Sequence, residues 1–103
     1  MNSPPRIYIA HAYAGDPFGN RARIRKICHL LLRQGLLPIA PQLWLYQIFN
    51  EDTQREEIMR MCLGYLETSD MVYQYTSTVG GVKDEVERAQ ELRIPVMYMG
   101  LYV

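Results

Sequence analysis

The sequence predicts an α/β protein, a three-layer αβα sandwich around a doubly wound parallel sheet of four to five strands (flavodoxin/Rossmann-like). Short β-rich runs alternate with longer segments whose apolar residues recur at helical spacing, in the order βαβαβαβ. The intervening segments are long enough to require parallel pairing of successive strands, with right-handed crossovers. Together these observations favour the strand order 2-1-3-4.

The first strand is expected over residues 6–10, because nearly continuous apolarity is typical of a central strand that is buried on both faces. A loop over residues 11–19 should follow, marked by a Gly-Asp-Pro turn. Asn20 looks like the N-cap of the first helix, which should extend to about Gln34. Gly35 is the expected stop signal of that helix.

The second strand is predicted over residues 36–40. Pro38 lacks a backbone donor, so this strand belongs at an edge of the sheet. Residues 41–50 are expected to form a long connection rich in aromatic side chains. The second helix is then predicted from residue 51 or 52 to about residue 68, with one apolar stripe facing the core.

The third strand is predicted over residues 70–75, the third helix from just after Gly81 to about residue 92, and the fourth strand over 95–99. In the order 2-1-3-4, the topological switch point lies between the first and third strands. The loops at their carboxyl ends, 11–20 and 76–81, should therefore face each other across one crevice. Open α/β sheets bind ligands at this place.

The composition narrows the classes of function. The 103 residues correspond to a single domain over 1–103, and equal numbers of acidic and basic residues give a formal net charge of zero. This balance argues against nucleic-acid binding, which usually requires a basic excess. No apolar run approaches the roughly 18 residues of a membrane span, and the first residues do not look like a signal peptide. We therefore expect a soluble, cytoplasmic protein.

The two cysteines, Cys28 and Cys62, do not have the spacing of a metal site. Each falls among apolar residues of a predicted helix. We therefore expect two buried thiols and no metal site.

Glu85 is the acidic residue whose position is most informative. It is predicted in the first turn of the third helix, which follows a Gly-Gly pair. At roughly 100° per residue, Glu85 lies beside the apolar stripe formed by Val82, Val86 and Ala89, so its carboxylate points toward the packed side of the helix. A helix N-terminus favours an ionised carboxylate by roughly 0.3–1 kcal/mol. Glu85 is therefore either a functional carboxylate or a residue that only satisfies the helix dipole.

Four segments together resemble one known family. Residues 7–15 match the family's opening strand and loop, residues 37–41 its second strand, and residues 69–72 its next strand. The fourth segment has the spacing Gly81-xxx-Glu85-xxx-Ala89. In this combination they resemble the nucleoside 2-deoxyribosyltransferase family, including its N-glycosidase relatives that act on nucleoside monophosphates. The resemblance covers nearly the whole chain. It implies that Glu85 matches the family's nucleophilic glutamate.

The sequence also departs from the family pattern. Members usually have an aspartate in the second helix, eight or nine residues before the third strand, where this chain has Met61 and Cys62. Many members also have an acid just before the glycine that precedes the nucleophile, and here that position is not acidic. Two helper carboxylates are therefore absent from this chain.

The resemblance implies a concrete chemistry. Loss of a base from a nucleoside passes through an oxocarbenium-like state, which a carboxylate under the anomeric carbon stabilises or attacks. Glu85 suits that role. Asp16 is the best candidate for the acid or for a ribose-hydroxyl binder, and is otherwise a turn former before Pro17. Tyr8 either packs in the core or places its hydroxyl against Glu85, as a strand tyrosine does in the family.

Other residues are candidates for substrate binding. The tyrosine of the first loop and the only tryptophan either stack on a base or pack internally. The histidine at the end of the first strand either binds phosphate, donates a proton or is only hydrogen-bonded. The glycine pair either presents backbone N–H groups to a phosphate or forms a tight turn. The substrate-binding candidates are His11, Tyr13, Asn20, Trp44, Gly80 and Gly81.

The expected function is cleavage or transfer of the N-glycosidic bond of a nucleoside or nucleotide, with Glu85 as nucleophile and without a cofactor. The alternative is a catalytically impaired nucleotide-binding or interaction module on the same fold. No nucleic-acid or membrane partner is expected. We expect a homodimer or higher homo-oligomer, because Trp44, Tyr46 and Phe49 offer apolar area that a small monomer struggles to bury.

Overall fold

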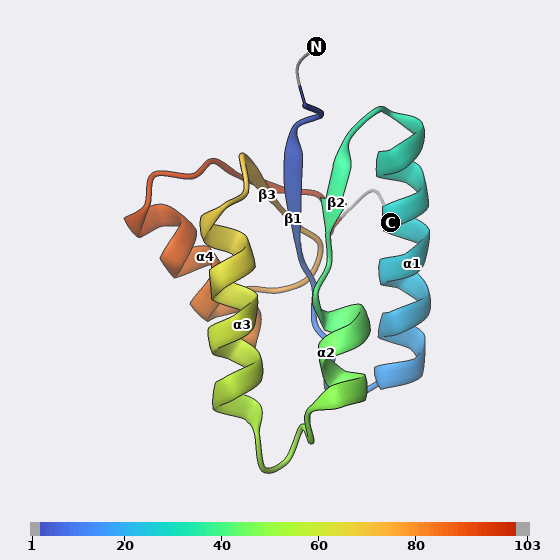
Figure 1. The fold of residues 1–103 in the computed structure, drawn as a ribbon, viewed down its shortest axis with the longest axis vertical. Coiled ribbons are helices and arrows are strands. Elements are labelled where there is room, and N and C mark those ends of the chain that lie inside the picture. Colours follow the sequence, from blue (N-terminus) through green and yellow to red (C-terminus); the bar gives the residue numbers. More distant parts are fainter. Residues whose placement is uncertain (1–2, 101–103) are drawn as a thin grey trace.

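The computed structural model describes residues 3–100, and its helices and strands alternate as expected for an α/β protein (Figure 1). In chain order, the elements of this region are β1 (Arg6–Ala10), α1 (Pro17–Arg33), β2 (Leu37–Ile39), α2 (Gln42–Ile48), α3 (Arg55–Glu67), β3 (Met71–Gln74), α4 (Gly80–Glu91) and β4 (Val96–Tyr98).

The strands form one parallel sheet in the order β2-β1-β3-β4, which confirms the predicted topology. In the register of this sheet, Tyr8 lies opposite Ile39 on β2 and Val72 on β3. The proline-containing strand β2 lies at the edge, as expected for a strand whose Pro38 has no N–H to donate.

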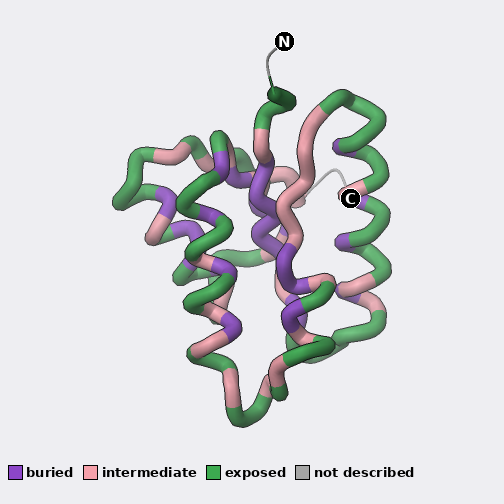
Figure 2. Tube along the Cα trace, in the orientation of Figure 1, coloured by how far each residue is buried: buried purple, intermediate pink, exposed green. Residues whose placement is uncertain are grey.

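The sheet is covered on both faces, because successive side chains of β1 point to opposite sides. Ile7 and Ile9 pack against α1, whereas Tyr8 and Ala10 pack against the core formed by α2, α3 and α4. Figure 1 shows α1 on one side of the sheet and α3 and α4 on the other. Figure 2 shows that β1 is buried along most of its length. The central strand therefore contributes side chains to two separate cores.

The first helix begins earlier than expected. Asn20 was predicted as its N-cap, but α1 starts at Pro17 and Asp16 is the capping residue. The Gly19 backbone N–H donates to the Asp16 side chain at 3.1 Å. An aspartate cap followed by proline at the first helical position is a strong start signal, and it takes precedence over the asparagine one turn later.

The region from residue 41 to 54 also differs from the prediction. The expected long connection contains the helix α2, and α3 begins at Arg55 rather than at residue 51 or 52. The Asn50 side-chain oxygen accepts hydrogen bonds from the backbone N–H groups of Asp52 and Thr53, at 2.9 and 3.2 Å. This turn keeps residues 50–53 outside the helix, because the asparagine offers their N–H groups a local alternative partner.

The remaining bounds shift by only one or a few residues from the predicted ones. Within residues 3–100, no helix has the length and apolar character needed to cross a membrane.

Candidate functional site

Three titratable side chains from three elements meet inside the core on the α3 and α4 face of the sheet. They are Tyr8 of β1, Cys62 of α3 and Glu85 of α4, with exposed fractions of 0%, 5% and 5%. Burial raises the pKa of Tyr8 well above its usual value, and the nearby charges of Glu85 and Cys62 raise it further. We refer to these three side chains as the buried cluster.

The Tyr8 hydroxyl belongs to the most deeply buried side chain of this cluster. It is fully buried beside the Glu85 carboxyl and the Cys62 thiol, yet it has no hydrogen bond of regular geometry to any residue within 3–100. The hydroxyl still acts on Glu85 and partly opposes the rise of its pKa, so the two groups interact. A buried hydroxyl needs such a polar neighbour, because burial without one costs roughly 1–3 kcal/mol.

The Glu85 carboxyl is protonated more readily than an ordinary glutamate. Burial raises its pKa to about 8, an effect that the Tyr8 hydroxyl partly opposes and Asp84 slightly strengthens. The expectation that a first-turn position keeps Glu85 ionised was wrong. Because α4 begins at Gly80, its first turn contains no acidic residue. The helix dipole acts mainly within that turn, so desolvation determines the pKa.

Two tyrosines stack at the same end of the molecule. The rings of Tyr13, in the loop after β1, and Tyr46, on α2, are parallel within 2° with centroids 3.8 Å apart. Tyr46 packs against the core that contains Tyr8 and Cys62. Burial raises the pKa of Tyr46 to about 12, and the charges of Cys62, Glu51 and Glu85 add to this effect. The stack therefore adjoins the buried cluster.

Asn20 and Asp16 hold the loop after β1 in place. The Asn20 side-chain amide donates to the Tyr13 carbonyl oxygen at 2.8 Å, and the Asn20 oxygen accepts from Arg23 at 2.7 Å. Asp16 caps α1 and lies 3.4 Å from Arg23, with its side chain 63% exposed. Both candidates thus have structural contacts in the ligand-free chain, and their proposed contacts with substrate stay predictions.

His11 is buried at the end of β1. Its Nδ1 donates to the Ala12 carbonyl oxygen at 2.7 Å, and burial lowers its pKa. The Ala12 backbone N–H donates to the Thr76 hydroxyl at 2.9 Å. This last hydrogen bond joins the loops that follow β1 and β3, so these two loops meet as expected from the strand order.

The glycine pair opens α4. Gly80 has a φ of +56°, in the left-handed region that favours glycine, and a Cβ on Gly81 would come within 2.7 Å of the Met59 terminal methyl group. Val79 caps the helix without a side-chain hydrogen bond. The first turn of α4 therefore leaves its backbone N–H groups uncapped by side chains, which is the arrangement that anions use at helix ends.

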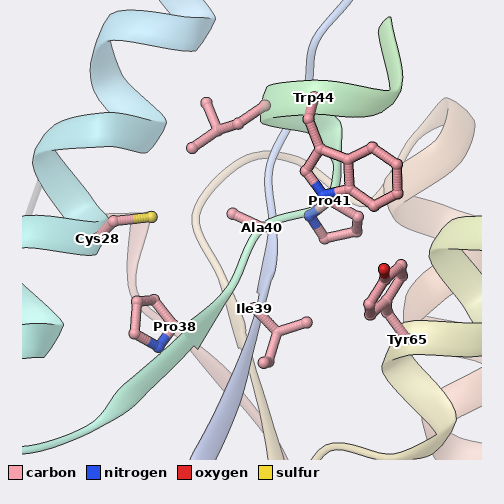
Figure 3. A pocket seen from close by; sticks show the side chains of 8 residues that line it. Cys28, Pro38, Ile39, Ala40, Pro41, Trp44 and Tyr65 are labelled. Atoms are coloured by element: carbon pink, nitrogen blue, oxygen red, sulfur yellow. The ribbon is translucent and has the colours of Figure 1, made fainter. Parts of the chain in front are cut away.

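Trp44 lies apart from the buried cluster. It lines an apolar cavity of about 290 Å³ together with residues of α1, β2 and α3, shown in Figure 3. Its ring meets Tyr65 edge-on, with centroids 5.9 Å apart at 85°. The lining residues are Cys28, Pro38, Ile39, Ala40, Pro41, Leu43, Trp44 and Tyr65. None of the three buried-cluster side chains belongs to this lining, so the structure does not bring Trp44 to Glu85.

Sequence reasoning did not identify three of the neighbouring residues. Cys62 was expected only as a buried thiol, and Tyr46 only as an apolar residue for an interface. Gln42 was not singled out, although it is buried, donates to the Ile9 carbonyl oxygen at 2.9 Å and has a side-chain oxygen without a partner among the described residues. The one available signal was that Met61 and Cys62 occupy the two possible positions of the missing helper aspartate. Over residues 3–100, no three His, Cys, Asp or Glu side chains gather as metal ligands.

Comparison with known proteins supports the fold. The structure is similar to a 2-deoxyribosyltransferase from the psychrotolerant bacterium Bacillus psychrosaccharolyticus, with a TM-score of 0.67 and 20% identity. It is also similar to a 2-deoxyribosyltransferase from Leishmania mexicana, with a TM-score of 0.69 and 19% identity. The matches cover 90% and 93% of this chain, which spans 70% and 64% of those proteins. At this identity, the likeness shows the fold alone.

The sequence itself has no significant match among curated proteins. A family model described as a domain of unknown function, DUF7768, matches residues 5–99. Because this match spans nearly the whole chain, the protein belongs to the DUF7768 family.

Proposed function

We propose that this protein cleaves or transfers the N-glycosidic bond of a nucleoside or nucleotide, with Glu85 as the nucleophile. The observation that supports this proposal most is the buried cluster. A buried carboxyl group from α4 and a buried tyrosine hydroxyl from β1 interact in a fold shared with 2-deoxyribosyltransferases. Buried carboxyls with a strongly shifted pKa are typical of functional sites.

In this mechanism the ionised Glu85 carboxylate attacks the anomeric carbon. A bond forms between the carboxylate oxygen and C1′ while the bond from C1′ to the base nitrogen breaks, and the electron pair leaves with the base. A general acid protonates the departing base, and Asp16 is our candidate for it. Water or a second base then attacks C1′, the bond from C1′ to the Glu85 oxygen breaks, and the deprotonated Asp16 takes the proton of the attacking group. The Tyr8 hydroxyl donates to the Glu85 carboxylate before the first attack and again after its release, when the carboxylate is charged.

The alternative is a nucleotide-binding module without turnover. Two observations favour it. Met61 and Cys62 occupy the two positions at which the resembled family usually has an aspartate, and the pKa of Glu85 is raised to about 8 by burial, which leaves few ionised carboxylates at neutral pH. In this alternative, Glu85 donates or accepts a hydrogen bond at a ribose hydroxyl instead of attacking carbon.

Incubation of the wild-type chain with nucleosides and deoxynucleoside monophosphates distinguishes the two. We expect chromatography to detect release of the free base from at least one substrate, in amounts that grow with enzyme concentration. Thermal stabilisation by a nucleotide without base release would instead support the binding module. If no substrate of the panel releases base and no nucleotide stabilises the protein, both the enzyme and the binding module are contradicted.

The same proposal includes a homodimer or higher homo-oligomer. Trp44 is 43% exposed on α2, and Met61 and Tyr65 on α3 are also exposed, so these residues offer an apolar surface near the open cavity. Tyr46 and Phe49, which were expected in this surface, pack inward against the core. Light scattering at high micromolar concentration should give at least twice the chain mass, and a monomeric mass would contradict the proposal.

A further inference from the structure

Tyr13 and Tyr46 stack with parallel rings. The centroids are 3.8 Å apart and the planes are parallel within 2°, so the flat face of Tyr13 is covered by another aromatic ring. A nucleobase is a better partner for a tyrosine face than a second electron-rich phenol, and bases stack readily on aromatic side chains.

The two rings are held unequally. Tyr13 is 7% exposed, and its hydroxyl accepts a hydrogen bond from Arg21 at 2.6 Å. The Arg21 guanidinium also lies 6.0 Å from the centre of the Tyr13 ring, and Asn20 binds the Tyr13 carbonyl oxygen. Tyr13 is therefore fixed from α1 through its side chain and its backbone.

Tyr46, in contrast, sits on a weak element. Its helix α2 has seven residues, and no side chain caps its N-terminus. Helices this short are not stable alone and depend on tertiary packing. Only Gln42 and Leu45 of α2 are buried, whereas Trp44 and Ile48 are exposed. Local opening at α2 is consequently the least costly way to separate the two rings.

The position of Tyr46 connects this separation to the buried cluster. Tyr46 packs on the core that includes Tyr8 and Cys62, and Glu85 is one of the charged groups close enough to act on its hydroxyl. Glu85 itself is only 5% exposed. A substrate therefore cannot place its anomeric carbon at Glu85 unless a covering side chain moves.

We propose that Tyr46 is an internal substitute for the base of the substrate: a planar nucleobase displaces Tyr46 from the Tyr13 face, and this displacement uncovers Glu85. This inference rests on the proposed function and extends it, because it assigns the base-binding surface and the residue that competes for it. The chain then admits a sugar to Glu85 only when a flat aromatic base occupies Tyr13. Because the closed state hides the binding surface, it weakens the apparent affinity by the fraction of open molecules.

The first test uses free bases, which have no glycosidic bond to cleave, so that its result does not depend on turnover. Binding of adenine and thymine is measured by calorimetry for the wild type, Tyr46→Leu, Tyr13→Leu and Ile48→Ala. Leucine keeps apolar bulk over the core, and Ile48 is an exposed control on the same helix. We expect Tyr46→Leu to bind at least one base about tenfold more tightly. Tyr13→Leu should bind about tenfold more weakly, and Ile48→Ala should match the wild type.

The second test reports on opening without any ligand. Cys62 is buried, and the other cysteine, Cys28, lines the separate cavity and is replaced by serine in every protein compared. The rate at which a small disulfide reagent labels Cys62 should rise at least tenfold in Tyr46→Ala, should rise less in Tyr46→Leu, whose side chain still covers part of the core, and should not change in Ile48→Ala. Circular dichroism checks that each variant keeps its helices.

Three outcomes overturn the inference. The first is a Tyr46→Leu variant that loses base affinity as Tyr13→Leu does, because Tyr46 would then be a wall of the site. The second is Cys62 labelling at the wild-type rate in both Tyr46 variants. The third is the absence of base binding in Tyr46→Leu. Faster labelling and tighter base binding, in a chain that releases no base from nucleosides, would support the inference and reject the enzymatic function.

Discussion

The buried cluster and the cavity beside Trp44 differ in open volume and in the chemistry of their side chains. The cluster of Tyr8, Cys62 and Glu85 is closed and contains groups that titrate, whereas the cavity has a volume of about 290 Å³ and an apolar lining without a charged residue. The same contrast separates the two thiols. Burial raises the pKa of both, but only Cys62 has Glu85 as an additional cause, and its pKa reaches about 12.

This difference shows that open volume and chemical capacity occur in different places in this molecule. An apolar cavity next to exposed aromatic residues suits packing against another surface. A carboxyl with a shifted pKa beside a buried tyrosine hydroxyl suits chemistry, even where the resting structure leaves no room for a ligand. The proposed function therefore concerns the closed cluster, and we expect variants of the two regions to behave differently.

The largest expected effect is on turnover in Glu85→Gln. Glutamine keeps the shape of the side chain but lacks the charge that the oxocarbenium-like state needs, so the rate of base release should fall roughly a thousandfold, about 4 kcal/mol. Single-turnover chromatography measures this loss. The matched control is Glu87→Gln, an exposed position on the same helix, which should keep full turnover. Undiminished base release in Glu85→Gln would reject the nucleophile assignment.

The pH dependence of kcat/KM should follow the ionisation of Glu85. The nucleophile is the ionised form, and burial raises the pKa of the free protein's Glu85 to about 8. For a substrate whose base leaves without protonation, we therefore expect kcat/KM to rise about tenfold per pH unit between pH 6 and 7 and to level above about pH 8. A flat profile for such a substrate over the same range would contradict Glu85 as the nucleophile.

Stability should change with pH in the opposite direction. The pKa of Glu85 is raised from its usual value of 4.5 to about 8 in the folded chain, so the folded state binds the proton more tightly than the unfolded state. This contribution is fully present below about pH 4.5 and is lost as the pH rises toward 8, by up to roughly 1.4 kcal/mol per unit. Urea unfolding at pH 5, 6.5 and 8 measures it.

Glu85→Gln is the control for that measurement, because glutamine does not titrate. The lowered pKa of His11 acts in the opposite direction below its usual value of 6.5 but is present in both proteins, so it cancels in the difference between them. Parallel stability curves for the wild type and Glu85→Gln would contradict the raised pKa.

The smallest expected effect belongs to the apolar cavity. Tyr65→Ala removes the edge-to-face contact with Trp44, whose centroids are 5.9 Å apart, and should lower the free energy of unfolding by about 0.5–1.5 kcal/mol. Base release should stay within about twofold of the wild type. A tenfold loss of turnover with unchanged stability would mean that this cavity belongs to the site after all.

The sequence alone predicted the topology and the position of one key carboxyl. Alternating runs and crossover lengths led to the order 2-1-3-4, Pro38 identified the edge strand, and the helical spacing placed Glu85 beside an apolar stripe. These features follow from local patterns of apolar and turn-forming residues, which adjacent positions determine. At the start of α1 the sequence offered two possible helix starts, and the helix begins at Asp16 and Pro17 rather than at Asn20.

Only the tertiary structure decided the pKa of Glu85 and which side chains surround it. Tyr8, Cys62 and Glu85 come from distant parts of the chain, and their mutual burial raises the pKa of Glu85 against the helix-dipole argument. The helix α2 is likewise a product of packing, because seven residues with little capping do not form a helix by themselves. Burial and long-range neighbours depend on how the whole chain packs. A local pattern predicts which residues enter the core, but it does not predict which of them meet there.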